Sequence, residues 1–267
     1  MTPATYTALT IAGSDPSGGA GIQADLKTFH QFGVYGTTAI TLLTVQNTRR
    51  LSTVSVLDPK LVLAQLDCVL GDFPCHAAKT GALGNARVVA AIAKRTKTFS
   101  FPLVVDPVLM SKKGKPLLDK EGFGLLKEKL LPSAFLVTPN FDEARALSGV
   151  EVKDLETMEK AAKVISRFGP EAVLIKGGDL KKKAVDLLYA GGKITLFSSH
   201  RVETHHTHGT GCVYSAAITA GLAKGKGLLE AVQAAKAFVS LAIQAHPGLG
   251  HGEGPLNLLV TARGEED

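Results

Sequence analysis

The sequence has little of several residue types, and each shortage excludes a class of protein. Its 267 residues contain three cysteines, no tryptophan and only 6% aromatic residues. Cys68, Cys75 and Cys212 are too few for a disulfide framework, and their spacing lacks the C-x-x-C pair of a zinc site. At least one thiol is therefore free, and Cys68, in a segment of helical period at 61–70, is expected in the core.

Long apolar runs and targeting signals are also lacking. No stretch approaches the ~18 consecutive apolar residues of a membrane-spanning helix. The opening MTPATYTALT has no basic stretch followed by a long apolar segment, so neither a secretory nor a mitochondrial signal is supported. We expect a cytoplasmic protein with no membrane partner.

Basic residues are in modest excess. Lysine and arginine number 30 against 24 acidic residues, a formal net charge of +6. The basic residues form short separate clusters at 49–50, 112–113 and 181–183, and few aromatic side chains are present to stack on bases, so we expect no nucleic-acid partner. A positive field around a small anionic substrate explains the charge better. The 28 glycines suit either ordinary turns or phosphate sites.

Apolar segments of strand length alternate with segments of helical period. We expect strands at 8–12, 37–45, 54–57, 77–80, 103–106, 135–138 and 172–176, and helices at 21–33, 61–70, 85–97, 120–130, 141–147 and 154–168. Strands separated by such helices predict an α/β fold with a mostly parallel central sheet and helices on both faces.

The last third of the chain has a different pattern. Two strands at 184–189 and 194–198 flank an Ala-Gly-Gly turn, which favours a hairpin at a sheet edge. Helices are expected at 211–223 and 228–245. Because no composition break or repeat interrupts the chain, we expect a single domain over residues 1–267 with a frayed tail at 261–267.

The strongest local signal is the hexapeptide THGTGC, residues 207–212, which runs into the helix expected at 211–223. A glycine-flanked turn at a helix start offers free backbone N–H groups and the positive end of the helix dipole to an anion. Gly209 and Gly211 let the backbone approach that anion, and Thr210 lies between them. Cys212 would face it with a lowered pKa, as a base or a hydrogen-bond donor. The alternative is an ordinary glycine turn with a buried cysteine.

A second glycine-rich segment, residues 13–21, follows the first expected strand. It lacks the G-x-G-x-x-G spacing of a dinucleotide loop and the Gly-Lys-Ser/Thr ending of a Walker loop. Loops at the carboxyl ends of parallel strands are where α/β sheets bind small ligands. This loop is therefore expected to bind substrate rather than nucleotide.

Three more loops follow expected strands in the same way. Asp106 and Glu143 are candidate Mg²⁺ ligands, because Mg²⁺ in phosphoryl-transfer sites takes one or two carboxylates with water and phosphate oxygens. Lys176, at a strand end before Gly177, suits a phosphate contact. Each signal is weak alone, since Asn140 and Glu143 could simply begin a helix. Their common position at one edge of the sheet gives them weight.

These segments together resemble a known family. IAGSDPSGGAGIQADLKTF, VYGTTAITLLTVQNT, AKTGALG, VVDPVLMSKKGKPLL, LVTPNFDEARALSG, VLIKGGDL and THGTGC are similar to hydroxymethylpyrimidine/phosphomethylpyrimidine kinase, of the ribokinase-like superfamily. The similarity runs in order from about residue 8 to 251. It implies a Mg²⁺-dependent, ATP-using enzyme of thiamine biosynthesis that phosphorylates 4-amino-5-hydroxymethyl-2-methylpyrimidine to its monophosphate and then to the diphosphate. It also suggests a homodimer.

The resemblance carries roles onto individual residues. Cys212 and the 209–211 turn correspond to the catalytic element, where the wider superfamily has Asp in place of Cys. Asn140 and Glu143 correspond to a metal and phosphate motif. From their positions in the loops, Lys176, Gly177 and Thr210 are further expected phosphate contacts. Gln46 corresponds to the residue that reads the aminopyrimidine, whose amine and ring nitrogen a carboxamide matches. The remaining expected substrate contacts are Gly13, Ala20, Gly21, Asp25, Ala82 and Val108.

One departure from the family pattern leaves alternatives open. Ala82 stands where many members carry Met, and the smaller side chain enlarges the pocket, which makes a pyridoxal kinase the nearest alternative. A non-catalytic pyrimidine sensor is the third possibility. The loop at 111–118 either closes over the phosphates or is an ordinary solvated loop.

Overall fold

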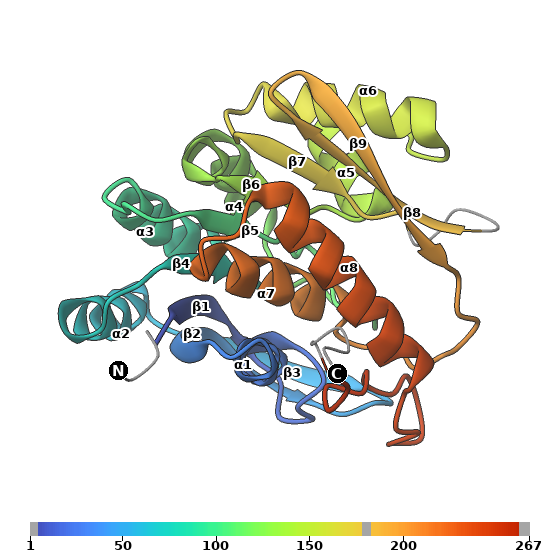
Figure 1. Cartoon of the computed structure of the whole chain (residues 1–267). Coiled ribbons are helices and arrows are strands. Elements are labelled where there is room, and N and C mark those ends of the chain that lie inside the picture. Colours follow the sequence, from blue (N-terminus) through green and yellow to red (C-terminus); the bar gives the residue numbers. More distant parts are fainter. Residues whose placement is uncertain (1–4, 178–182, 262–267) are drawn as a thin grey trace.

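The computed structural model describes residues 5–177 and 183–261. These residues form a nine-stranded sheet in the order β3-β2-β1-β4-β5-β6-β7-β8-β9 (Figure 1). The six strands in its middle are parallel to one another: β1 (Thr7–Ser14), β2 (Tyr35–Gln46), β4 (Ala77–Thr80), β5 (Leu103–Val105), β6 (Leu136–Val137) and β7 (Ala172–Ile175). This confirms the expected α/β class and mostly parallel sheet.

The two edges of the sheet are antiparallel. At one edge, β3 (Leu51–Val56) pairs with β2, and at the other, β8 (Lys183–Ala190) and β9 (Lys193–His200) form the expected hairpin. The β2–β3 pairing was not predicted. A local signal explains it, because the Asn47 side chain accepts hydrogen bonds from the amides of Arg49 and Arg50 and so closes the turn.

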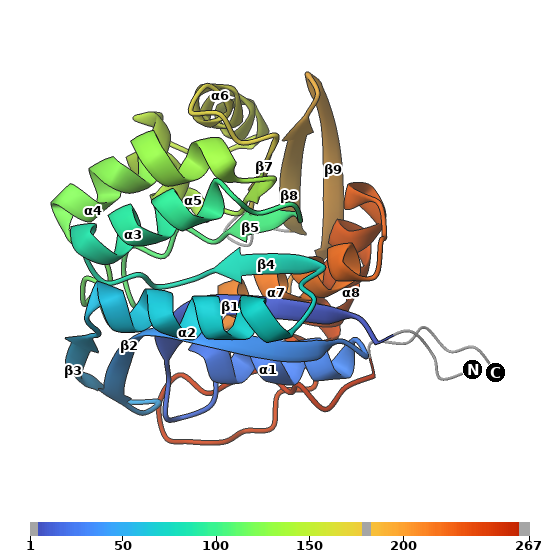
Figure 2. The same cartoon turned by 90° about the vertical axis from the view of Figure 1, so that its left-hand side faces the viewer.

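Helices cover both faces of the sheet (Figure 2). One group of helices packs on one face of the sheet and shares a core with it: α2 (Pro59–Asp72), α3 (Ala86–Thr96), α4 (Lys120–Leu125), α5 (Phe141–Ser148) and α6 (Leu155–Ser166). A second, separate core lies under α1 (Gly21–Gln31), α7 (Thr210–Ala223) and α8 (Leu228–Gln244). None of the described helices is long and apolar enough to cross a membrane.

Three details differ from the expectations. The helix expected at 120–130 is α4 followed by a π-helical turn over Leu126–Leu130. Strand β6 has only two residues where four were expected. Cys68, expected in the core, is exposed, because α2 buries Val62 and Leu66 and a residue two positions after Leu66 points away from them.

The parallel strands bring their carboxyl ends to one edge of the sheet. The loops after β1, β4, β5 and β6 therefore meet there, together with Lys176 directly after β7 and the N-terminus of α7. That edge holds two adjoining pockets.

Candidate active site

The smaller pocket, of about 180 Å³, collects most of the predicted site residues. Its lining includes Gly13, Ala20, Gly21, Gln46, Ala82, Asp106, Val108, Asn140, Glu143, Lys176, Gly209, Thr210, Gly211 and Cys212. They come from segments that span nearly the whole sequence and meet because the parallel strands end together.

A larger pocket of about 880 Å³ adjoins it. Its wall comes mainly from β8, the segment at 199–207, α7 and α8. Asn140, Lys176, Thr210 and Gly211 line both pockets. A group transferred from one pocket to the other would therefore pass beside the start of α7.

The start of α7 is built by the second glycine loop, residues 207–211. Gly209 is the N-cap and has a left-handed backbone with φ of 82°, and no side chain caps the helix. The Thr210 amide donates to the Thr207 carbonyl at 3.3 Å, whereas the amides of Gly211 and Cys212, like other early N–H groups of a helix, have no intrahelical acceptor and are available to an anion. A Cβ on Gly211 would lie 3.2 Å from the Lys176 ammonium, which places a full positive charge beside these amides.

Two carboxylates surround that ammonium. Lys176 Nζ lies 2.9 Å from Asp106 Oδ1, which also accepts a hydrogen bond from Thr138 at 3.1 Å. Burial would lower the pKa of Lys176, but the charges of Asp106 and Glu143 outweigh it and raise that pKa. Burial raises the pKa of Glu143 to about 7, against the opposing charge of Lys176. Glu143 also accepts a hydrogen bond from the Asn140 amide at 2.8 Å, in a capping box that starts α5.

The donor set here fits magnesium bound together with a nucleotide. The described residues contain no group of three or more His, Cys, Asp or Glu side chains that could hold a metal alone. Asp106 and Glu143 offer carboxylate oxygens, and Mg²⁺ typically completes its shell with water and substrate phosphates. A cation here would also favour the ionised form of Glu143.

The expected low pKa of Cys212 is wrong. Burial raises the pKa of this thiol to about 12, and neither the charge of Lys79 nor a hydrogen bond from the Gly21 amide compensates. The sulfur packs against the core under α7 and α8, which the sequence motif does not reveal. The thiol is therefore neutral at rest, so of the two expected roles the structure favours the hydrogen-bond donor.

Two other predicted residues do not reach the pockets. Asp25 is fully buried beneath the smaller pocket, where its carboxylate lies 2.7 Å from Lys79 Nζ and 2.6 Å from Thr10 Oγ1. The Gly177 amide donates to Asp186 Oδ1 at 2.8 Å and is thus not free for a phosphate. A Cβ on Gly177 would lie 1.7 Å from the Val185 carbonyl oxygen, so close strand packing explains this glycine. Gly178 and Asp179, which follow it, lie outside the described residues.

Sequence reasoning missed two buried polar groups. Asp186 accepts hydrogen bonds from Tyr214 and from Lys236, each at 2.8 Å, and lies in the wall of the larger pocket. Asp15 lies 2.8 Å from His208 at the smaller pocket. Both groups join residues far apart in the sequence, and no local motif signals such a pairing.

Comparison with known proteins agrees with this geometry. The family model described as phosphomethylpyrimidine kinase matches residues 15–257. The chain is 46% identical over 257 residues to hydroxymethylpyrimidine/phosphomethylpyrimidine kinase of Rhizobium meliloti, covering 95% of this chain and 97% of that protein. It is 44% identical over 261 residues to the thiamine biosynthesis bifunctional protein ThiED of Geobacter sulfurreducens, covering 97% of this chain but only 53% of that protein. The chain thus spans about half of that longer relative.

A solved structure shows the same architecture. The ADP complex of Bacillus subtilis pyridoxal kinase superposes with a TM-score of 0.88 at 41% identity, covering 95% of this chain and 97% of that one. This confirms the expected ribokinase-like α/β fold. By its sequence from residue 15 to 257, the chain belongs to the phosphomethylpyrimidine kinase family.

Proposed function

We propose that this protein phosphorylates the hydroxymethyl group of 4-amino-5-hydroxymethyl-2-methylpyrimidine with ATP and then converts the monophosphate to the diphosphate for thiamine diphosphate biosynthesis. Its relatives named for this activity match nearly the full chain. The observation that carries the proposal is the junction of the two pockets at Lys176, Thr210 and Gly211. An acceptor in the smaller pocket and a nucleotide in the larger one would meet there.

The smaller pocket suits an aminopyrimidine. Gln46 lies in its wall and offers one acceptor and one donor side by side, which matches an exocyclic amine next to a ring nitrogen. Small or apolar groups make up the rest of the expected contact surface: Gly13, Ala20, Gly21, Ala82 and Val108. A flat ring fits against such a wall without polar groups left unpaired.

Phosphoryl transfer needs positioning and charge neutralisation more than covalent chemistry. The amides at the start of α7 and the Lys176 ammonium are in place to bind the transferred phosphoryl group. Asp106 and Glu143 would hold Mg²⁺, which neutralises phosphate charge when bound. The neutral Cys212 thiol faces the acceptor and orients its hydroxyl by a hydrogen bond.

Pyridoxal kinase is a second candidate. Ala82 in the pocket wall leaves room for a larger ring, and the Bacillus subtilis structure with the same fold is a pyridoxal kinase. Turnover of ATP should be measured with the hydroxymethylpyrimidine, its monophosphate and pyridoxal offered separately. Turnover of both pyrimidines with little of pyridoxal supports the main proposal, a preference for pyridoxal supports the second, and no turnover with any of them supports a non-catalytic sensor.

The assembly and location are part of the same proposal. We expect a homodimer of single ribokinase-like domains, acting in the cytoplasm where ATP is available. Tyr35, Leu43 and Val45 on β2 are large apolar side chains at least 47% exposed, which is consistent with a covered surface in the assembly. Light scattering on the purified protein would test it, and a mass near the 27.9 kDa of one chain would contradict it.

A further inference from the structure

Two glycine loops from opposite ends of the chain pack directly on each other. The first is residues 13–21, which lines the smaller pocket, and the second is residues 207–211 at the start of α7. A Cβ on Gly209 would lie 1.8 Å from the Gly19 carbonyl oxygen, and one on Gly19 would lie 2.7 Å from the His208 ring. The acceptor side of the site and its anion-binding turn are therefore in backbone contact.

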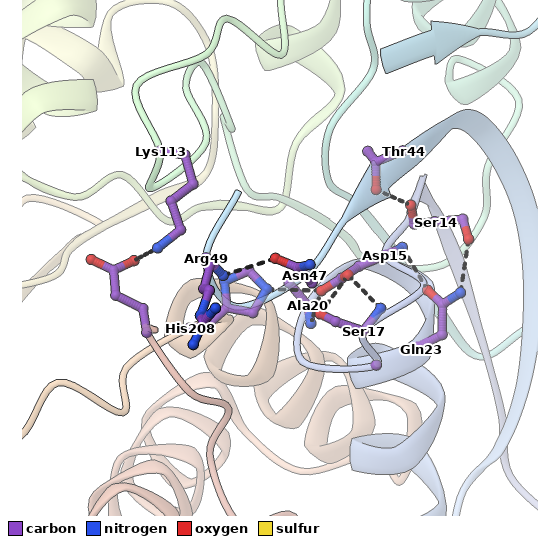
Figure 3. A network of polar contacts seen from close by, with 12 residues as sticks. Ser14, Asp15, Ser17, Ala20, Gln23, Thr44, Asn47, Arg49, Lys113 and His208 are labelled. Carbon is purple, nitrogen blue, oxygen red and sulfur yellow. Dashed lines mark hydrogen bonds and ion pairs between the residues drawn. The ribbon is translucent and has the colours of Figure 1, made fainter. Parts of the chain in front are cut away.

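A single carboxylate joins these loops. Asp15 is 2% exposed, and its Oδ2 lies 2.8 Å from His208 Nε2 and 2.9 Å from the Ala20 amide. Its Oδ1 accepts hydrogen bonds from the amide and hydroxyl of Ser17, at 2.9 and 2.7 Å. Figure 3 shows the His208 ring pointing at this carboxylate, with Ser17 and Ala20 around it. The same group thus shapes the first loop and holds the second.

His208 is itself fixed by a third segment. Its amide donates to the Gly254 carbonyl at 3.1 Å, and the residue forms a bridge with Pro255. The imidazole therefore has little freedom to leave Asp15. Its position also fixes Gly209, the N-cap of α7.

The charge state of Asp15 matters for its neighbour in the pocket wall. Burial would raise the pKa of Asp15, but hydrogen bonds from His208, Ser17 and Gln46 outweigh it and lower that pKa to about 2. The ionised carboxylate only accepts hydrogen bonds, so the amide nitrogen of Gln46 must be the atom that faces it. The Gln46 carbonyl oxygen and the second hydrogen of its amide nitrogen are then left to pair with a ligand.

We propose that Asp15 and His208 act as a positioning pair, which aligns the acceptor-binding loop and the Gln46 amide with the anion-binding turn. The inference rests on the proposed function, since it assumes that the smaller pocket holds the acceptor. The pair contacts no reacting atom. It acts by keeping the attacking hydroxyl in line with the phosphoryl group, where small displacements are costly.

The test uses four variants of the full chain and one matched control. H208F removes the hydrogen bond, H208Q keeps a donor near the position of Nε2, D15N removes the charge, and D15N/H208F removes both partners. D67N is the control, because it removes a carboxylate from the exposed pair with Arg95. Steady-state kinetics are measured for ATP and for the alcohol that the wild type phosphorylates best. Calorimetry gives the affinities for ADP and for that alcohol.

In H208F and D15N we expect kcat/KM for the alcohol to fall by about 10- to 100-fold, the range for losing a hydrogen bond to a charged group. The KM for ATP and the affinity for ADP should stay within about twofold, and H208Q should recover most of the loss. The double variant should be no worse than either single variant by more than about threefold, because both changes break one interaction.

Three results would overturn the pairing: multiplied losses in the double variant, an equal weakening of ATP and alcohol binding, or an H208Q variant as impaired as H208F. If H208F does not fold, D15N and H208Q decide between the same outcomes. Failure of the proposed function is seen separately, as absent turnover by the wild type. In that case the affinity of D15N for the hydroxymethylpyrimidine, compared with that of D67N, still tests the pair.

Discussion

At the scale of single residues, Cys212 shows how burial changes the meaning of a motif. A cysteine at a helix N-terminus suggests an activated thiolate, yet this sulfur lies against the second core and the pKa of its thiol is about 12. A neutral thiol can orient an alcohol but cannot be a preformed base. Its contribution should therefore depend on which acceptor is attacked.

We predict that Cys212→Ala slows the first phosphorylation by about tenfold or more and the second by much less. An alcohol needs to be oriented and to lose its proton, whereas the phosphate acceptor of the second step is already anionic. The two rates are measured with the purified alcohol and the purified monophosphate. Cys68→Ala is the control, since that thiol is exposed on α2. Equal slowing of both steps would show that Cys212 does not act by orienting the alcohol.

Glu143 gives a prediction about pH. In the unfolded chain its pKa is near the ordinary 4.5, and in the folded protein burial raises it to about 7. Between these values the folded state binds more protons at Glu143, so the contribution of this residue to the free energy of unfolding falls as pH rises from about 4.5 to 7.

Glu143→Gln removes this dependence. Relative to the wild type, we expect the variant to gain about 1 to 3 kcal/mol in unfolding free energy between pH 5 and pH 8. Urea denaturation of metal-free and nucleotide-free protein at the two pH values measures the gain. Glu156→Gln, on the exposed side of α6, should show none of it. A constant difference between Glu143→Gln and wild type would refute the raised pKa.

At the scale of elements, the start of α7 depends on glycine for two separate reasons. Gly209 has a positive φ of 82°, and a Cβ there would also collide with Gly19 of the first glycine loop. Gly225, just after α7, has a similar φ of 75° but open space around it. Substitutions at these two positions therefore distinguish the effect of backbone strain alone from the effect of losing the contact between the loops.

We predict that Gly225→Ala costs about 1 kcal/mol of stability and leaves kcat/KM unchanged, because only backbone strain is added. Gly209→Ala should in addition lower kcat/KM by about 100-fold, because the two glycine loops must separate and the reacting groups lose alignment. Denaturation curves and initial rates test both. Unimpaired catalysis in Gly209→Ala would mean that the contact between the loops is dispensable.

Helix α8 is tied to the sheet by a buried ion pair. Lys236 on α8 and Asp186 on β8 are both under 10% exposed, and no other cation is paired with Asp186 among the described residues. Lys226 and Glu230 form a matched exposed pair at the start of the same helix.

We expect Lys236→Met to lower the unfolding free energy by about 3 kcal/mol, since it leaves a buried carboxylate without its counter-charge. Lys226→Met should change it by less than about 0.5 kcal/mol, because solvent already screens that pair. Chemical denaturation of both variants gives the comparison. Equal effects would show that the Asp186 charge is satisfied by Tyr214 and the Gly177 amide alone.

At the scale of the whole molecule, periodic segments predicted the architecture well. The hairpin β8–β9 followed from its glycine turn, and α7 and α8 were placed to within a residue because their apolar patterns are long. The convergence of Asp106, Glu143 and Lys176 followed from the rule that parallel strands end together. Short elements such as β6 were placed less well, because tertiary pairing decides their ends.

The positions of some polar side chains could not be predicted from the sequence. They depend on which face of a helix is buried and on partners that lie far away along the chain. Asp25 was expected at the ligand, but its face of α1 turns toward Lys79, a partner 54 residues away. Asp15 and His208 are 193 residues apart, and nothing in either local motif requires their contact. Such pairs become visible only once the sheet order is known.

The contact between the two glycine loops also affects synthesis of the protein, because the site is complete only after the second loop has been made. β1 lies inside the sheet and precedes every other described strand along the chain, while α7 and α8 follow all of them. Until α7 and α8 are made, α1 covers β1, but the apolar residues of β4, β5, β6 and β7 in the same core lack the cover of these two helices. A nascent chain that ends at β9 therefore exposes an apolar part of the sheet to water and carries only half of the site. Synthesis of the segment that follows β9 therefore both removes that aggregation hazard and completes the site.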